Sequence, residues 1–175
     1  VPHALFRLEE DTQGYFELLE RIVAAHGIPL AVYRDRHSIF ETAPGRHQSL
    51  EEQLAGQKEP TQFGRLLGEL GISSIPSNSP QGRGRIERLW GTFQDRLVSE
   101  LRLAGAQNMA QANQVVKEFL PRYNQRFMVP AAQPGSAYRP TPPGFIPEEV
   151  FCRKHQRSVG SDNVVRFEGH RLPIH

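Results

Sequence analysis

Apolar side chains recur at helical spacing in four stretches of the chain, which predicts four amphipathic helices. A residue that can cap a helix precedes three of them, and a glycine that can end a helix follows two. The third stretch is the most regular, and a proline late in the fourth predicts a kink or an early end there. The stretches are bounded by Asp11 and Gly27, Thr61 and Gly71, Gly84 and Leu101, and Asn108 and Pro121.

Short apolar runs predict strands between and after these helices. Residues 30–33 are apolar without alternation, which is typical of a strand covered on both faces in a parallel sheet. The pattern therefore favours an α/β fold. Residues 76–82 are dense in turn formers, so we expect a turn before the third helix. The other predicted strands are residues 4–8, 72–75, 150–152, 163–167 and 172–174.

Proline content divides the chain. Six prolines between residues 130 and 147 favour an extended, semi-rigid connection over a packed element. We therefore predict a core domain at 1–129, a Pro-rich linker at 130–147 and a partial β module at 148–175. Residues 45–60 are polar and weakly patterned, so we expect an exposed loop or a short mobile helix there without chemistry.

Composition indicates a globular protein, since 38% of the 175 residues are hydrophobic and 23% are charged. One cysteine excludes an internal disulfide, and no apolar run approaches the roughly 20 residues that cross a bilayer, so we expect a bacterial cytoplasmic protein without membrane contact. The net charge is only +2, but 18 arginines stand against 3 lysines. Arginine binds phosphate through two parallel hydrogen bonds, which suits nucleic acid, and codon bias explains the ratio equally well.

Two carboxylates stand at predicted element boundaries. Asp35 follows the strand at residues 30–33, where open α/β sheets place their ligands, and Glu87 lies in the first turns of the third helix. Carboxylates are the ligands that Mg²⁺ prefers, and two metal ions can activate and stabilise the oxygens of a phosphodiester. The alternatives stay open on spacing alone: Glu87 as an ion-pair partner of Arg83 or Arg88, and Asp35 as a turn former.

The residues around these acids form ordered motifs that resemble the integrase-like catalytic core of bacterial insertion-sequence transposases of the ISNCY type. The resemblance covers most of residues 11–130. Its most specific part is Ser79-Pro80-Gln81 followed by Arg85-Ile86-Glu87-Arg88. The other motifs are Tyr15-Phe16-Glu17-Leu18-Leu19, His26-Gly27-Ile28-Pro29, Tyr33-Arg34-Asp35-Arg36-His37-Ser38-Ile39-Phe40, Thr61-Gln62-Phe63-Gly64-Arg65, Leu70-Gly71-Ile72, Leu89-Trp90-Gly91-Thr92-Phe93 and Tyr123-Asn124-Gln125-Arg126-Phe127.

The resemblance implies a ribonuclease H-like fold in which three acids bind Mg²⁺ or Mn²⁺ for DNA strand cleavage and strand transfer, the reactions of DNA transposition, integration and recombination. Asp35 matches the second acid and Glu87 the third. The first lies on a strand that is absent from these residues, so we expect a fragment cut short at both ends that is inactive alone. Without that strand, residues 30–33 are expected to leave an exposed edge.

The family also implies DNA partners, a homo-oligomer in the full-length protein, association with the nucleoid and a small β domain after the core. Three arginines near Glu87 favour contact with DNA phosphates, and a solvated basic face is the alternative. These are Arg83, Arg85 and Arg88.

Five further residues have competing interpretations. His37 suits either substrate contact or a structural hydrogen bond. Cys152 and His155 resemble half of a zinc site, but we expect a buried thiol and an exposed imidazole because no second pair completes it. Trp90 lies on the apolar stripe of its helix, as does Phe93, which favours core packing over base stacking.

Three functions follow as hypotheses. The first is a fragment of a metal-dependent DNA transposase. The second is a non-catalytic DNA-binding remnant or regulator of transposition, which keeps a basic surface. The third, a plain helical scaffold, requires the motif matches to be accidental.

Overall fold

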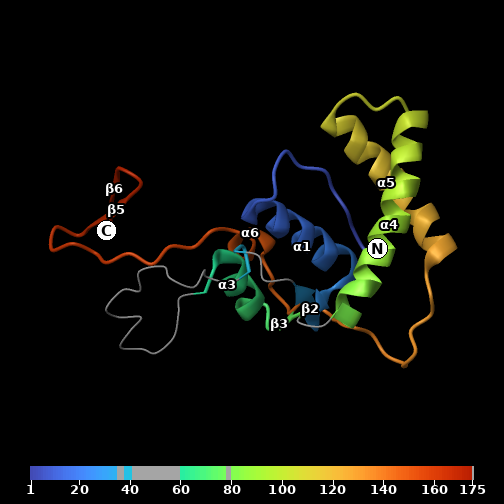
Figure 1. Ribbon diagram of the computed structural model, residues 1–175. Coiled ribbons are helices and arrows are strands. Elements are labelled where there is room, and N and C mark those ends of the chain that lie inside the picture. The colour runs from blue at the N-terminus through green and yellow to red at the C-terminus, as the bar shows by residue number, and fades with distance from the viewer. Residues whose placement is uncertain (35–37, 41–59, 78–79, 175) are drawn as a thin grey trace.

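The computed structural model describes residues 1–34, 38–40, 60–77 and 80–174, and the side chains of residues 80–83 and 85 are outside the description (Figure 1). Helices and small sheets alternate, so the chain is a mixed α/β structure, as the sequence predicts. In chain order the elements are α1 (Thr12–His26), β1 (Ile28–Pro29), β2 (Ala31–Arg34), α3 (Gln62–Glu69), β3 (Ser73–Pro76), α4 (Pro80–Leu103), α5 (Met109–Phe127), β4 (Tyr138–Arg139), α6 (Pro147–Val150), β5 (Val164–Phe167) and β6 (His170–Pro173).

The predicted capping residues begin three of the helices. Each cap places a side-chain oxygen against a backbone N–H that has no partner within its helix. Asp11 accepts from Gly14 N at 2.8 Å, and Thr61 accepts from Gly64 N at 3.0 Å. Asn108 accepts from the third residue of α5, Gln111 N, at 3.0 Å. The local sequence thus determines where α1, α3 and α5 begin.

Two helix boundaries differ from the prediction. Helix α4 begins at Pro80, within the segment predicted to be a turn, because proline suits the first helical position: its φ is already helical and its missing N–H has no helical partner there. Helix α5 passes through Pro121 and ends only at Phe127, so an early end at the proline is wrong. The surrounding turns hold α5 together despite the lost hydrogen bond.

The predicted strand at residues 4–8 is wrong, since this segment is an irregular extended chain. Asparagine side chains of α5 hold it in place of a strand partner. Phe6 N–H donates to Asn113 Oδ1 at 2.7 Å, and Asn113 Nδ2 donates back to Phe6 O at 3.1 Å. Asn124 makes the same pair with the backbone of Val1, at 2.7 Å in both directions. We call each such two-way pair an amide clasp.

Strand β2 pairs in parallel with β3, but it is not covered on both faces as its apolar run predicts. Tyr33 is 71% exposed, and Leu30, just before the strand, is half-exposed. In the described residues β2 also has β3 as its one strand partner, so its other edge is unpaired, as the sequence predicts.

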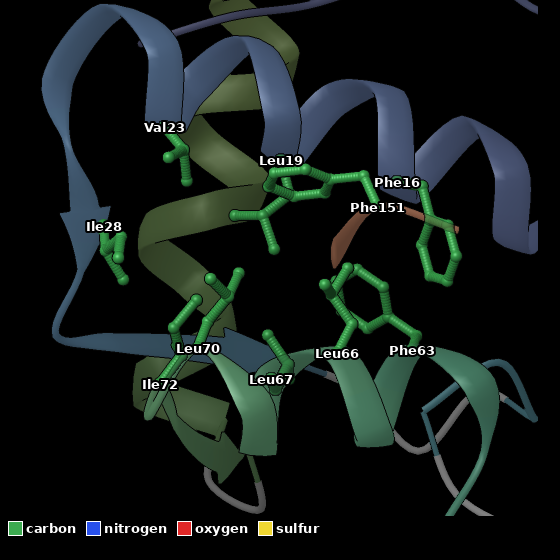
Figure 2. Close-up of a cluster of buried hydrophobic side chains, with 10 residues drawn as sticks. All are labelled: Phe16, Leu19, Val23, Ile28, Phe63, Leu66, Leu67, Leu70, Ile72 and Phe151. Atoms are coloured by element: carbon green, nitrogen blue, oxygen red, sulfur yellow. The ribbon is translucent and has the colours of Figure 1, made fainter. Parts of the chain in front are cut away.

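The first core cluster lies between α1 and α3 (Figure 2). Phe16 from α1 and Leu66 from α3 are fully buried and face each other across it. Full burial of such a side chain contributes about 1.5 to 3 kcal/mol, so this cluster is a main source of stability. Its members are Phe16, Leu19, Val23, Ile28, Phe63, Leu66, Leu67, Leu70, Ile72 and Phe151.

The second cluster joins α4 to α5. Phe93 lies at its centre, 5.2 Å from Tyr123 and 5.5 Å from Phe119 between ring centroids. Phe93 is 2% exposed, so its predicted place in the core is confirmed. Trp90 stacks edge-on against Phe93 at 5.6 Å but stays 46% exposed, so the same prediction is wrong for Trp90.

The chain after α5 returns to the first cluster. Strand β4 pairs antiparallel with β1, and the Arg139 guanidinium donates to Leu70 O. The strand predicted at residues 150–152 is wrong: residue 150 ends the short helix α6 (Pro147–Val150), and Phe151 then inserts into the cluster. A third amide clasp joins Gln62 to the backbone of Lys154, at 2.7 and 3.0 Å. The Pro-rich segment therefore carries packed residues, and the domain boundaries stay a prediction.

The two strands predicted at residues 163–167 and 172–174 are present, as β5 and β6, and they form a hairpin. Strands β5 and β6 pair antiparallel around a turn in which Glu168 has φ 47° and Gly169 has φ 81°. Two positive φ angles in succession are typical of a two-residue turn that matches the twist of its strands.

Candidate functional site

The carboxyl ends of β2 and β3 lie side by side at one edge of their sheet. Their parallel register pairs Arg34 with Pro76, and Ser77 N donates to Arg34 O at 2.7 Å just beyond the strands. Asp35 is the residue after Arg34, as the sequence predicts for a strand end, although Asp35 and His37 both lie outside the described residues.

Helix α4 begins close to the same edge. Three residues separate the end of β3 at Pro76 from the start of α4 at Pro80. Figure 1 shows the first turns of α4 leaving the neighbourhood of β2 and β3. Glu87 is the eighth residue of α4, which places its Cα roughly 10 Å along the helix axis from Pro80. The sheet therefore brings the chain at Arg34 beside Pro76, 42 positions later in the sequence and four positions before α4 begins.

The Glu87 carboxylate is exposed, and no hydrogen bond or ion pair joins it to a side chain within the described part of the chain. Arg88 is also exposed, and its guanidinium folds back towards Gly84, with Nη1 3.8 Å from the position of a Cβ there. The backbones of Arg83 and Arg85 belong to α4, but their side chains are outside the description. The alternative of a Glu87–Arg88 ion pair therefore finds no support.

The residues on either side of positions 35–37 are firmly held. On one side, Arg34 Nε donates to Ser74 Oγ at 2.6 Å. On the other, Thr61 Oγ1 donates to Ile39 O at 2.7 Å, and the Phe40 ring lies 5.0 Å from that of Tyr15. The sequence predicts no functional role for the Tyr15–Phe40 pair, although both residues fall inside the quoted motifs.

A cavity of about 610 Å³ opens beside the first half of α4. Its walls are α1, the extended segment before α1 and the apolar residues of α4 next to Glu87. Ile86 is 49% and Leu89 40% exposed towards solvent, so the wall formed by α4 is largely apolar and uncovered. The exposed Glu87 carboxylate is therefore next in sequence to a residue of this apolar wall, Ile86.

Three side chains among the described residues have shifted pKa values. Burial lowers the pKa of His3, which lines the cavity; Arg21 lowers it further and Glu17 opposes both. The hydrogen bond from Gly14 N is the main reason that the pKa of Asp11 is low. Burial raises the pKa of Glu69, but hydrogen bonds from Arg65 and Lys154 outweigh it, and the net shift is downward.

Comparison with known proteins gives two similar sequences. The chain is 38% identical over 172 residues, 97% of its length, to the provisionally named transposase y4bF of Sinorhizobium fredii. It is 29% identical over 165 residues, 94% of its length, to the transposase for insertion sequence IS1202 of Streptococcus pneumoniae. The chain is a homologue of insertion-sequence transposases.

The transposase homologue spans about a third of the length of these relatives, 36% of the first and 34% of the second. No family profile matches the chain, and no solved structure matches it either.

The described residues contain no group of three or more His, Cys, Asp or Glu side chains arranged to hold a metal ion. Cys152 is half-buried and donates to Glu149 O at 3.3 Å, while His155 is exposed and stacks on Phe167 at 5.0 Å. The exposed imidazole matches its prediction, whereas the thiol is less buried than expected. Within the same described segments, no helix is long and apolar enough to cross a membrane.

Proposed function

We propose that this chain is part of the catalytic core of a DNA transposase, with a ribonuclease H-like fold, and that it acts in DNA strand cleavage and strand transfer. The observation that carries the proposal is the parallel pairing of β2 with β3. It brings Arg34, the residue before Asp35 in the sequence, beside Pro76, four positions before the start of the helix that carries Glu87. Ligands and chemistry collect at such edges in open α/β sheets.

Asp35 and Glu87 are the proposed ligands of Mg²⁺ or Mn²⁺. Both offer carboxylate oxygens, which these hard cations prefer, and such ions keep several waters and need only a few protein ligands. The exposed, unpaired Glu87 carboxylate fits this role among the described side chains. When bound, the metal supplies an activated oxygen nucleophile and stabilises the leaving oxygen.

Arg83, Arg85 and Arg88 are the proposed contacts to DNA phosphates beside the acids. Arg83 lies in the first turn of α4, where the unpaired backbone N–H groups also favour anions, and Arg85 and Arg88 lie in the second and third turns. Exposure of Arg88 supports its access to a ligand as large as DNA.

The chain alone is expected to cleave DNA poorly or not at all. The resemblance places the first of the three acids on a strand that matches no segment of these 175 residues. Two acids can begin metal binding, whereas turnover needs all three.

Mn²⁺ binding tests the proposed acids directly. We expect the chain to bind Mn²⁺, measured by water-proton relaxation, and the Asp35→Asn, Glu87→Gln double variant to lose most of this binding. Asp95→Asn, an exposed acid two turns further along α4, is the matched control and should leave binding unchanged. Equal Mn²⁺ affinity in the chain and the double variant would contradict the metal site.

A nicking assay with Mg²⁺ then tests turnover. We expect no cleavage by the chain alone. If the chain did cleave DNA and Glu87→Gln abolished the cleavage, the expected inactivity would be overturned and the proposed role of Glu87 supported. DNA binding without any metal affinity would instead favour a regulator that binds DNA without cutting it.

A further inference from the structure

We infer that residues 137–154 form a strap that docks on the core as one unit, and that its docking surface is α3 together with the turn between α1 and β1. Docking fixes the point from which the chain continues to the β5–β6 hairpin. The inference uses neither Asp35 nor Glu87, so it can hold or fail apart from the function proposed above.

The first end of the strap binds the turn between α1 and β1 through its backbone. Leu30 N donates to Ala137 O at 2.9 Å, just before β4 pairs with β1. Gly27 follows α1 with φ 89°, and a Cβ at this position would collide with Arg139 O. A glycine is therefore needed here both for the backbone angle and for the close approach of the strap.

The other end of the strap is held by side chains of α3. The Arg65 guanidinium donates to Cys152 O, and Gln62 forms its amide clasp with Lys154. The Lys154 ammonium also lies 3.0 Å from a carboxylate oxygen of Glu69. The three side chains of α3 are spaced by three and four positions, so they share one face of the helix. This face gives Gln62 and Arg65, both within a quoted motif, a role that the sequence does not predict.

An apolar anchor lies between the two ends. Phe151 is 8% exposed and belongs to the first core cluster with Phe16 and Leu66, as Figure 2 shows. Phe145 packs against the same cluster, with its ring centroid 6.3 Å from that of Phe151. Because the anchor follows the first end and precedes the second, the strap is attached at three successive places.

The proline content of the strap favours docking. Proline has few conformations in the unfolded chain, so a proline-rich segment loses less entropy when it becomes ordered. The same residues that predict a semi-rigid connection therefore also prepare the strap for binding. They are Pro140, Pro142, Pro143 and Pro147.

Docking limits the reach of the hairpin. Residues 155–163 connect the docked strap to β5, and even a fully extended connection of this length spans only roughly 30 Å. Without docking, the connection would begin after α5 and comprise residues 128–163. The strap thus keeps the hairpin near α3 and not near α5.

Amide hydrogen exchange in the full chain, followed by NMR, tests whether the strap is one unit. The Gln62→Ala, Arg65→Met double variant removes three hydrogen bonds at one end and keeps an apolar stem at position 65. The reporter is the Leu30 amide, because its acceptor belongs to the opposite end of the strap. We expect this amide to exchange roughly tenfold faster, since each lost bond makes a modest net contribution. The slowest amides of α5 should not change.

Two further variants make the result specific. Gln13→Ala removes an exposed glutamine from the first turn of α1, and it should leave the Leu30 exchange rate unchanged. Gly27→Ala disturbs the first end, and it should accelerate exchange of the Lys154 amide at the other end. An unchanged Leu30 rate in the double variant would mean that the two ends are separate local contacts. Equal acceleration of Leu30 and α5 would mean a general loss of stability, and either result would overturn the inference.

Discussion

The two halves of helix α4 carry the same apolar stripe but meet different surroundings. In the second half, Phe93 and Leu97 pack under α5 and are almost completely buried. In the first half, Ile86, Leu89 and Trp90 continue the stripe at helical spacing and are 40 to 49% exposed beside a cavity. Periodicity tells which face of a helix is apolar, and only the tertiary structure tells how far that face is covered.

The exposed first half of α4 also carries the candidate functional residues. Glu87 and Arg88 lie between the apolar residues in the sequence, so charged groups and exposed apolar groups share the same two turns. The covered half, by contrast, has the role of joining α4 to α5. The first half is therefore where α4 can gain contacts, and the second half is where it already has them.

The largest effect is expected from Phe93→Ala. It removes the ring at the centre of the α4–α5 cluster, which costs about 3 to 5 kcal/mol for a buried phenylalanine. Urea unfolding followed by circular dichroism measures the change. Phe93→Leu keeps most of the volume and should cost less than half as much; equal losses would show that the cluster does not depend on its packing.

A smaller effect is expected from Trp90→Ala, because about half of this side chain is already in water. We expect a loss of about 1 kcal/mol in the free energy of unfolding. Trp90 is the one tryptophan of the chain, so its fluorescence reports on the open half directly. Acrylamide should quench it readily. Emission typical of a buried indole, with weak quenching, would mean that the two halves of α4 do not differ in solvent exposure.

Smaller still is the effect of Asn113→Ala, which opens one amide clasp. Each hydrogen bond contributes about 0.5 to 1.5 kcal/mol, and water can replace both at this exposed site, so we expect a net loss of less than about 1 kcal/mol. The freed segment lines the cavity next to Trp90, so acrylamide quenching should increase. Gln114→Ala, the neighbouring position on α5, is the control and should change neither quantity.

The smallest effect is a pH dependence from His3. Its pKa is lower in the folded chain than the unfolded value of about 6.5, so the unfolded state binds the proton more tightly. Stability is therefore complete above pH 6.5 and decreases as the pH falls below it. The low pKa values of Asp11 and Glu69 act only in more acidic solution. Urea unfolding at pH 7.5 and 5.5 should show the decrease, and His3→Gln should reduce it.

Capping residues made the helix starts predictable, because Asp11, Thr61 and Asn108 act through bonds three residues away. The strand predicted at residues 4–8 failed for the opposite reason. Its backbone partners are amide groups of α5 more than 100 positions later in the sequence, and no local pattern announces them.

The same contrast between local and long-range causes applies to the candidate site. The sequence correctly put the end of a strand immediately before Asp35, since an apolar run ends there. It could not show that the Glu87 helix starts near this strand end, because that depends on the parallel register of β2 with β3. The metal ligands themselves stay a prediction, as do the arginines beside them.

The amide clasps have a consequence for how the chain opens. In a sheet, neighbouring hydrogen bonds support each other, so backbone amides become exposed to solvent exchange in groups. The Phe6 amide instead depends on a single asparagine side chain, in a segment with no strand partner. Native-state hydrogen exchange should therefore find one slowly exchanging amide among fast neighbours, released by a local fluctuation long before the helices unfold.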